Sequence, residues 1–423
     1  MNILHLLTND FGGAANVCLN IQEHLLECGY SSNVIALNKS SDLENQNIVQ
    51  YNDHIYRTSL SNKLNHYIKY FYPWLFNILL KDQPNEHEVF TFPYSFFDLT
   101  KHPLYTKADI IHLHYVSYLL NWRSFFRKNK KPVVWTMHDM NVFTGGCHIS
   151  EDCDEYKKNC RECPQLRLSY IPHFSRKIYE LKANCIKDAN NMIFVAPSEW
   201  LQNIANESSI LTGQDIRMIR NGIDKNTFYP IEKEKARQKI DLKTDKKIIF
   251  FIADSIKRKN KGLWKLIESL DHADDPENLF LLSVGFDLPQ NLLTKCEKRS
   301  FPFVSKRSDL KYFYSAADIT VMPSLYEVFS LVTAESLTCG TPVVAFNNSG
   351  QKELIDHKEN GYLAEPFDPK DLAKGIEYCL NDKINHQLQR NAARKMQNSY
   401  SAKDMSNGYI SIYKELLKKD HHD

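Results

Sequence analysis

Short apolar runs, rich in β-branched residues, alternate with amphipathic segments along most of the chain. In the first half, residues 2–7, 32–37 and 192–196 predict strands, and residues 16–28 carry apolar side chains at helical spacing. The second half restarts at residues 247–253 with an apolar run that predicts a strand buried on both faces. This alternation predicts two α/β domains, each built on a parallel sheet.

The second half continues the same alternation. Residues 279–284 predict a strand and residues 301–304 a further one, and Ser308 is expected to cap a helix that runs to Ala317. Two amphipathic helices end the chain, and the last begins near Ala402 with a continuous apolar stripe. That stripe needs a partner surface, which either its own domain or the first domain can provide.

The stretch 321–345 organises the second half, because it reads as strand, loop, helix and strand. Ser330 is expected to cap the helix, and Gly340 stands where a left-handed residue would end it. The loop between such a strand and helix lies at the carboxyl edge of a sheet, where open α/β folds bind ligands. Unpaired amides and the positive end of the helix dipole suit a phosphate group there.

Two carboxylates, Glu327 and Glu335, lie on either side of the start of this helix. We expect Glu327 in the loop and Glu335 on the second helical turn, both facing one pocket. Because a carboxylate accepts hydrogen bonds from sugar hydroxyls, we assign Glu335 to a nucleotide ribose and Glu327 to a transferred sugar. The alternative is a pair of solvated surface carboxylates.

Other candidate ligands of an anion lie where predicted strands lead into helices. Arg258 and Lys261 are suited to neutralise a diphosphate, although a solvated basic loop is the alternative. Gly12 and Gly13 would let the backbone approach a ligand, but they equally fit a plain turn. The fingerprint G-x-G-x-x-G is absent, so the sequence does not indicate a dinucleotide site.

His138 follows a strand-like run at what would be its carboxyl end. At that edge it could bind a sugar hydroxyl or a developing charge, and a structural histidine is the alternative.

Four cysteines cluster in the first half, with the spacing Cys147-x5-Cys153-x6-Cys160-x2-Cys163. The final Cys-x2-Cys fits the turn of a structural zinc site, and His148 is a possible substitute ligand. Free buried thiols are the alternative, and disulfides are the least favoured in a reducing compartment.

Composition and charge narrow the function classes. The 423 residues are 43% apolar and 25% charged, as in globular proteins, and suggest two or three domains. A net charge of +2 argues against nucleic acid as the main partner. No signal peptide is visible, so we expect a cytoplasmic protein. The aromatic run 67–80 is too short to span a bilayer; with lysines around it, it could dock at a membrane surface or belong to the core.

These motifs together resemble the signature of retaining glycosyltransferase family 4, in its bacterial branch for surface polysaccharides of the colanic acid, capsule and O-antigen type. The resemblance covers nearly the whole chain apart from residues 40–105. It rests on Glu327-x7-Glu335, Cys339-Gly-Thr-Pro-Val-Val-Ala345, Gly350, Glu353, Gly361, Asn221-Gly-Ile-Asp224, Lys261-Gly262, Gly12-Gly13, His138-Asp139, Phe143-Thr-Gly-Gly-Cys-His148 and the cysteine cluster.

The resemblance implies a GT-B architecture, with two Rossmann-like domains facing a cleft. Residues 1–224, with a cysteine-rich insertion at 143–166, would form the acceptor-side domain. Residues 225–400 would bind the nucleotide sugar, and the helix 401–423 would pack back on the first domain.

The resemblance also implies the roles of individual residues. Lys261 and Arg258 would hold the diphosphate, and His138 would face the transferred sugar. Glu327 would bind that sugar, and Glu335 the ribose. The remaining donor contacts would come from Gly12, Gly13, Asn221, Phe329, Ser330 and Leu331.

Two departures from the family pattern concern the phosphate contacts. The usual Gly-Arg after the first strand of the second half is replaced by Ala253-Asp254-Ser255, so Arg258 would substitute for that arginine. Ser330 stands where glycine is common.

The predicted function is therefore a hexosyltransferase that moves a sugar, with retention, from a nucleotide sugar to a saccharide acceptor, which is expected to be lipid-linked. No catalytic metal is expected, and any zinc would be structural. A peripheral contact with the inner face of the membrane is expected, and binding of nucleic acid is not. The rivals are a nucleotide-sugar epimerase or sugar-phosphate synthase of the same fold, and a non-catalytic scaffold that binds nucleotide sugars.

Overall fold

The computed structural model describes residues 1–39, 47–51, 89–166, 173–187, 189, 191–253, 258–285, 288 and 295–420. The aromatic stretch 67–80 with its lysines, and residues 254–257, lie outside the described residues. The chain divides into two compact units. Unit 1 comprises Met1–Pro84, Glu88–Arg220 and Lys403–Asp423, and unit 2 comprises Asn85–His87 and Asn221–Ala402.

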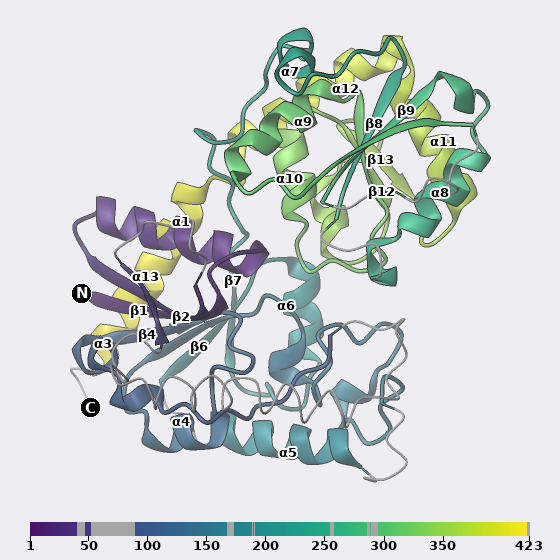
Figure 1. Ribbon diagram of the computed structural model, residues 1–423. Helices are drawn as coiled ribbons and strands as arrows, with labels where there is room; N and C mark the ends of the chain where they lie inside the picture. Colours follow the sequence, from purple (N-terminus) through teal and green to yellow (C-terminus); the bar gives the residue numbers. More distant parts are fainter. Residues whose placement is uncertain are drawn as a thin grey trace, which may run out of the picture. The chain divides into compact units, whose positions relative to one another are not determined.

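Unit 1 is built on a parallel sheet with the strand order β3-β2-β1-β4-β5-β6-β7 (Figure 1). The order reverses between β1 and β4, so the loops that follow these two strands leave the sheet in opposite directions. The described strands are β1 (Asn2–Asn9), β2 (Ser31–Asn38), β3 (Ile48–Gln50), β4 (Ile110–Leu113), β5 (Val133–Thr136), β6 (Met192–Ala196) and β7 (Asp215–Met218).

Helices cover both faces of this sheet (Figure 1). One face packs on α1 and on the C-terminal helix α13, whose Tyr409 and Tyr413 are fully buried against Ile3 and Ile110. On α4, Trp122 lies 4.6 Å from Trp135 of β5, measured between ring centroids. The described α-helices are α1 (Gly13–Glu27), α3 (Pro103–Lys107), α4 (Trp122–Lys128), α5 (Phe174–Lys187), α6 (Glu199–Asn206) and α13 (Ala402–Asp420).

Unit 2 has a second parallel sheet, with the order β10-β9-β8-β11-β12-β13. Its strands are β8 (Lys247–Ile252), β9 (Leu279–Val284), β10 (Glu297–Phe301), β11 (Ile319–Met322), β12 (Val343–Phe346) and β13 (Gly361–Ala364). Its α-helices are α7 (Lys233–Lys239), α8 (Leu263–Asp271), α9 (Leu310–Ala316), α10 (Leu331–Thr338), α11 (Pro369–Leu380) and α12 (Asp382–Asn398).

Strand β8 shows why continuous apolar runs form the centre of such a sheet. Ile248 and Phe250 belong to the core that includes α9 and α10, whereas Ile249 and Phe251 belong to the core that includes α8 and α11. All four side chains are at most 1% exposed, as expected for a parallel strand covered by helices on both faces.

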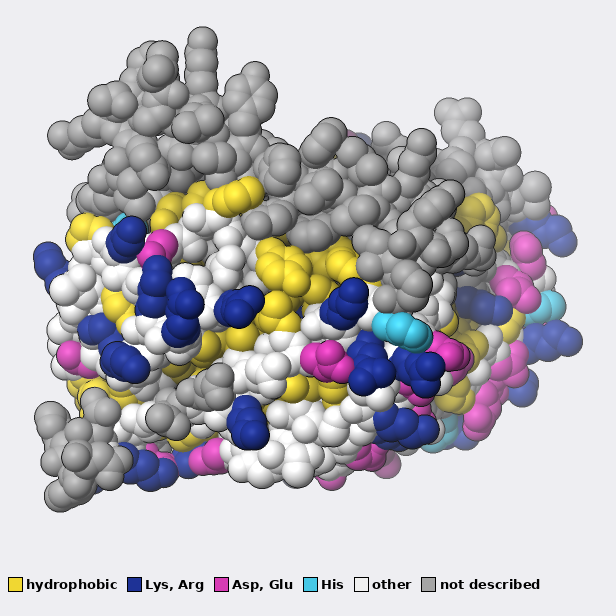
Figure 2. Space-filling view, turned by 90° about the horizontal axis from the view of Figure 1, so that it is seen from below, with side chains coloured by type: hydrophobic (Ala, Val, Ile, Leu, Met, Phe, Trp, Pro, Cys, Tyr) yellow, Lys and Arg dark blue, Asp and Glu magenta, His cyan; other side chains and the backbone are white. Residues whose placement is uncertain are grey.

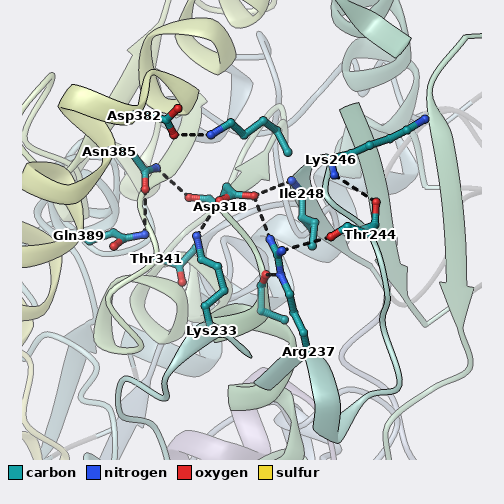
Figure 3. A network of polar contacts seen from close by, with 12 residues as sticks. Lys233, Arg237, Thr244, Lys246, Ile248, Asp318, Thr341, Asp382, Asn385 and Gln389 are labelled. Carbon is teal, nitrogen blue, oxygen red and sulfur yellow. Dashed lines mark hydrogen bonds and ion pairs between the residues drawn. The ribbon is translucent and has the colours of Figure 1, made fainter. Parts of the chain in front are cut away.

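A polar network fixes the amino edge of this sheet (Figure 3). The carboxylate of Asp318 accepts a hydrogen bond from the backbone N–H of Ile248 at 2.7 Å and pairs with Lys233 of α7 at 2.6 Å. Its backbone carbonyl accepts from Asn385 of α12 at 3.0 Å. Asp318 thereby ties α7 and α12 to the first residues of β8 and β11. This edge lies opposite the carboxyl ends of the strands, so the network is structural.

The structure corrects two predicted elements. The strand expected at 301–304 is instead β10, Glu297–Phe301, because a charged edge strand shows no apolar run and Pro302 has no N–H for the ladder. The helix expected to start at Ser308 starts at Leu310, after the 3₁₀ turn η7 (Arg307–Asp309), and Ser308 does not cap it.

The prediction of two Rossmann-like domains is confirmed, as is the packing of the last helix on unit 1. The two segments that link the units run parallel to each other beside Gly222, where Ile223 and Ser401 form a β-bridge. A Cβ at Gly222 would lie 2.4 Å from the carbonyl oxygen of Ser401, so only glycine allows this close pairing. Among the described residues, no helix is both long and apolar enough to span a membrane.

Candidate functional site

In unit 2 the strand order reverses between β8 and β11, and the loops that follow these two strands are joined to each other. The backbone N–H of Leu325 donates to the carbonyl oxygen of Asn260 at 2.8 Å. The side chain of Asn260 accepts from the N–H of Tyr326 and donates to its carbonyl, both at 2.9 Å. Open α/β folds bind ligands at such a switch point, beyond the carboxyl ends of the strands.

Lys261 and Glu327 meet across this switch point. The ammonium of Lys261, on the 3₁₀ turn η5 (Lys259–Lys261), lies 2.8 Å from the carboxylate of Glu327, and the two side chains are 22% and 16% exposed. The N–H of Glu327 donates to the hydroxyl of Ser349 at 3.0 Å. Ser349 has a φ of 48°, a left-handed conformation that costs a non-glycine residue about 1–3 kcal/mol. The carboxylate is thus held in place with an accessible cation beside it.

Gly262 allows this close approach of the two loops. It has a φ of 68°, and a Cβ at this position would lie only 1.8 Å from the carbonyl oxygen of Pro323. Any side chain would therefore push Lys261 away from Glu327.

Helix α10 begins at this edge, as the sequence predicts. Ser330 is its N-cap, and the Ser330 hydroxyl accepts from the N–H of Thr333 at 3.1 Å. Phe329 is 8% exposed and Leu331 is partly exposed. Gly340, with a φ of 80°, follows the C-cap as expected.

Glu335 lies on the second turn of α10, as predicted, but its partners were not predicted. The residue is only 3% exposed. Its carboxylate pairs with the guanidinium of Arg307 and accepts a hydrogen bond from the hydroxyl of Tyr314 at 2.9 Å. Burial and the adjacent carboxylate raise the pKa of Tyr314, so its hydroxyl stays protonated and keeps donating. Arg307 also lies 5.0 Å above the ring of Phe228. Nothing in the sequence signals these partners, because they come from a different helix and turn.

The corresponding switch point of unit 1 holds histidines. His138 Nε2 lies 3.0 Å from His114 Nδ1, and His114 Nε2 lies 3.1 Å from His5 Nδ1. His112, on β4 and two residues before His114, contacts the hydroxyls of Tyr413 and Thr136 at 2.7 and 2.8 Å. A small cavity of about 20 Å³ is lined by His114 and His138.

These histidines are neutral near pH 7. Burial lowers the pKa of His5 to about 3 and that of His138 to about 4, and it also lowers the pKa of His112 and of His114. A neutral imidazole can exchange a hydrogen bond with a sugar hydroxyl without adding a charge.

Asp139, next to His138, is held by hydrogen bonds. Its carboxylate lies 2.6 Å from His148 Nδ1 and accepts from the N–H of Asn141 at 2.8 Å. Burial acts to raise the pKa of Asp139, but His148, the N–H of Asn141 and His138 together outweigh it, and the pKa is lowered. His148 Nε2 lies 2.8 Å from the hydroxyl of Thr91, so neither ring nitrogen is left for a metal.

The remaining predicted donor residues lie in different surroundings. Gly12 caps α1 with a φ of 89°, and no atom lies within 4 Å of where its Cβ would be, so its backbone is open to a ligand. Gly13 is the first residue of α1. Arg258 is exposed, three residues before Lys261. Asn221 is 4% exposed, and its Oδ1 has no hydrogen-bond partner in the structure.

Two groups of metal-ligating side chains occur in unit 1. Among the described residues, only His5, Cys18 and His114 offer three such ligand atoms within 4.8 Å of one another. The four clustered cysteines instead line one small cavity together.

A large cavity of about 1140 Å³ lies at the amino edge of the unit 1 sheet, away from the switch point. Its lining includes Arg123 and Arg127 of α4 and the first residues of β5, β6 and β7. Figure 2 views the molecule from the side of α4 and α5, where cationic side chains lie among apolar ones.

Both halves of the chain match models of known protein families. The model described as Glycosyltransferase Family 4 matches residues 11–227, and the model described as Glycosyl transferases group 1 matches residues 232–396.

Similar proteins agree with these matches. The putative colanic acid biosynthesis glycosyl transferase WcaC of Escherichia coli K12 is 25% identical over 430 residues, which cover 96% of this chain and 97% of that protein. Anabaena HepE, solved with UDP and glucose, has a TM-score of 0.65 at 19% identity and covers 98% of this chain and 100% of its own. Sucrose-phosphate synthase from Thermosynechococcus elongatus has a TM-score of 0.67 at 17% identity, with 99% of this chain and 100% of that chain covered. The two structures show a shared fold.

Proposed function

Because the chain belongs to glycosyltransferase family 4, we propose that it transfers a sugar from a nucleoside diphosphate sugar to a hydroxyl of a saccharide. The resemblance seen in the motifs is confirmed, and so is the assignment as a glycosyltransferase. The observation that carries the proposed chemistry is the pair Lys261 and Glu327 at the switch point of unit 2, beside the start of α10.

In the proposed reaction, an acceptor hydroxyl oxygen bonds to the anomeric carbon of the donor. The bond from that carbon to the diphosphate oxygen breaks, and the diphosphate leaves with both electrons while the hydroxyl proton passes to it or to water. Lys261 and the first amides of α10 stabilise the charge that develops on the diphosphate. Glu327 accepts a hydroxyl of the transferred sugar, and Glu335 accepts the ribose hydroxyls through lone pairs that Arg307 and Tyr314 leave unused.

We assign the acceptor to unit 1 and a retained anomeric configuration to the product. Retention requires the acceptor oxygen to arrive on the face that the diphosphate leaves. His138 is uncharged near pH 7, so in this proposal it hydrogen-bonds a hydroxyl of the transferred sugar and does not compete with Lys261 for the diphosphate.

The acceptor class in this proposal is a lipid-linked saccharide of a surface polysaccharide. The support is the similarity to WcaC, which is named for colanic acid biosynthesis and matches nearly end to end. The similarity to HepE, solved with UDP and glucose, favours a UDP-sugar among the donors to test first. The reaction would then take place on the cytoplasmic side of the membrane, where the protein would make a peripheral contact.

The test is calorimetric binding of UDP, GDP, ADP and CMP, and of their common sugars, to wild type and to Glu335→Gln. We expect one diphosphate to bind well and to lose about 1–3 kcal/mol in the variant, as for a lost charged hydrogen bond. Tyr314→Phe is the matched control, because it removes a hydrogen bond to the same carboxylate and leaves the pair with Arg307. An equal loss in both variants would assign Glu335 to structure rather than to the donor.

Transfer assays then separate the acceptor classes. With the donor fixed, product formation is measured with a free saccharide, with the same saccharide on a polyprenyl diphosphate, and with no acceptor. Turnover that needs the lipid supports the finer proposal, and equal turnover with the free saccharide removes the lipid from it. Conversion of the donor sugar without an acceptor would favour an epimerase.

A further inference from the structure

The four clustered thiols of unit 1 surround a single small cavity. Cys147, Cys153, Cys160 and Cys163 all line a space of about 10 Å³, roughly the room of one water-sized sphere. They lie within residues 143–166, and Cys160 has a left-handed φ of 48°, which non-glycine residues adopt only rarely. Cysteines this close in sequence reach a common centre only when the backbone folds around it.

The backbone around the cavity is packed too tightly for other residues. A Cβ at Gly145 would lie 2.9 Å from Cys160 Cβ and 2.7 Å from the carbonyl oxygen of Ser175. A Cβ at Gly146 would lie 2.2 Å from the ring of Phe90. The hydroxyl of Ser175 on α5 donates to the carbonyl of Cys160 at 2.6 Å. The positions of the thiols are therefore set by packing against α5 and Phe90.

Backbone amides face the sulfur atoms. The N–H of Gly145 donates to Cys160 Sγ at 3.2 Å. Backbone hydrogen bonds from Glu155 and Gln165, each two positions further along the chain, reach the thiols of Cys153 and Cys163. Hydrogen bonds of this kind orient and stabilise metal-bound thiolates.

A buried cation lies under the same segment. Lys182 of α5 is 0% exposed, and its ammonium donates to the carbonyl of Thr144 and to Asn141 Oδ1, both at 3.2 Å. Four thiolates around a divalent cation carry a net charge of −2, so a buried ammonium nearby favours that state over four neutral thiols.

We propose that Cys147, Cys153, Cys160 and Cys163 bind one Zn²⁺ ion in a closed structural site. Tetrahedral zinc has Zn–S distances of about 2.3 Å, which place the sulfur atoms about 3.8 Å apart. In the described structure no three of these thiols lie within 4.8 Å of one another, so binding draws them together around the cavity that they line.

The other group of ligand atoms, His5, Cys18 and His114, suits a metal less well. His5 and His114 are hydrogen-bonded to each other, and the second nitrogen of His114 contacts His138. This group has only three ligands and lies inside the apolar core, so it is better described as part of a hydrogen-bonded histidine chain.

Zinc at the cysteines would position the candidate catalytic histidine indirectly. Cys147 is followed by His148, which holds the carboxylate of Asp139 beside His138. Loss of the ion would loosen this loop while leaving the donor loops of unit 2 intact. The expected signature is a lower kcat with an unchanged Kd for the nucleoside diphosphate.

The experiment is zinc analysis of full-length protein purified under reducing conditions without added metal. We expect about one zinc per chain in wild type and in Cys185→Ser, and a severalfold loss in Cys147→Ser. The two cysteines are matched, because both lie in unit 1 and both are 7% exposed. Wild type exchanged with Co²⁺ should show the charge-transfer absorbance of cobalt bound to thiolates.

The wild-type measurements decide the question even if Cys147→Ser does not fold. Folded wild type with well under one zinc per chain, and no cobalt–thiolate absorbance, would overturn the proposal. So would a mass spectrum that shows disulfides among these cysteines in protein isolated with thiols trapped. Zinc that persists in Cys147→Ser but is lost in His5→Ala would move the metal to the histidine group and would also overturn it.

Discussion

The two switch points of this glycosyltransferase have the same topology and opposite chemistry. In unit 2, the loops after β8 and β11 carry ion pairs, Lys261 with Glu327 and, nearby, Arg307 with Glu335. In unit 1, neutral histidines on β1 and β4 and just beyond β4 and β5 are joined to one another and to Tyr413 of α13. The fold places a loop edge at the same point of each sheet, and in the proposed function the charged edge of unit 2 would bind the diphosphate and the neutral edge of unit 1 the sugar hydroxyls.

The largest loss of catalytic efficiency is expected from removing the ammonium group of Lys261 in unit 2. Lys261→Met should lower kcat/KM by roughly 10²–10³-fold, which corresponds to about 3–4 kcal/mol of transition-state stabilisation. The matched control is Lys265→Met, on the next turn, where the lysine pairs with Glu268 at 3.4 Å. Steady-state kinetics on folded protein give the answer. A rate within a few-fold of wild type would show that Lys261 does not meet the diphosphate.

Removing the neutral imidazole of His138 in unit 1 should lower kcat without changing the affinity for the nucleotide. His138→Ala is expected to lower kcat by about 10²-fold, because a hydrogen bond to the reacting sugar is lost. The Kd of the nucleoside diphosphate without its sugar should stay within a factor of about two. His272→Ala, an exposed histidine after α8, is the control. A parallel loss of nucleotide affinity would contradict the proposal that unit 2 binds the nucleotide and that His138 of unit 1 contacts only the sugar.

The two units should also differ in their response to acid. The folded pKa values of His5, His112, His114 and His138 lie below the usual 6.5, so their neutral burial stabilises unit 1 fully above that pH. This stability is lost as the pH falls from about 6.5 towards 4, because the unfolded chain binds the protons. Each histidine contributes a slope of about 1.4 kcal/mol per pH unit.

Hydrogen exchange of each unit at pH 7 and pH 5, corrected for intrinsic rates, measures this difference. His5→Asn keeps a side-chain hydrogen-bond donor near His114 but cannot titrate. It should therefore reduce the pH dependence of the stability of unit 1 by the contribution of one histidine. Asp139, whose pKa is lowered from the usual 3.8, loses its contribution only at lower pH, outside the interval from pH 7 to pH 5. Equal acid sensitivity of the two units would show that the histidines are not buried neutral.

The smallest effect concerns the nucleotide base. Phe303 follows β10 at the carboxyl edge of the unit 2 sheet, and this residue is 71% exposed. If the base stacks on it, Phe303→Ala should weaken donor binding by about 1 kcal/mol without changing stability. Trp264→Ala, 58% exposed on α8, is the control, and unchanged donor affinity in Phe303→Ala would place the base elsewhere.

Local patterns predicted many elements closely. Residues 279–284 and 192–196 form β9 and β6 as expected, and the strand, loop and helix around Ser330 have the predicted cap. The pattern failed at β10, where the residues are charged because an edge strand is only half covered, and at the start of α9, where a 3₁₀ turn precedes the helix.

What the sequence determined by itself was the order of strands and helices, the family, and the residues that carry charge near the switch points, since periodicity, caps and motif spacing are local properties. Only the tertiary structure decided how those charges are used. Arg307 and Tyr314 reach Glu335, and Tyr413 reaches His112 over 301 positions of the chain, through contacts that no local pattern records. Burial then set the protonation of the histidines, because the free energy of a charge depends on its surroundings and not on its neighbours in sequence.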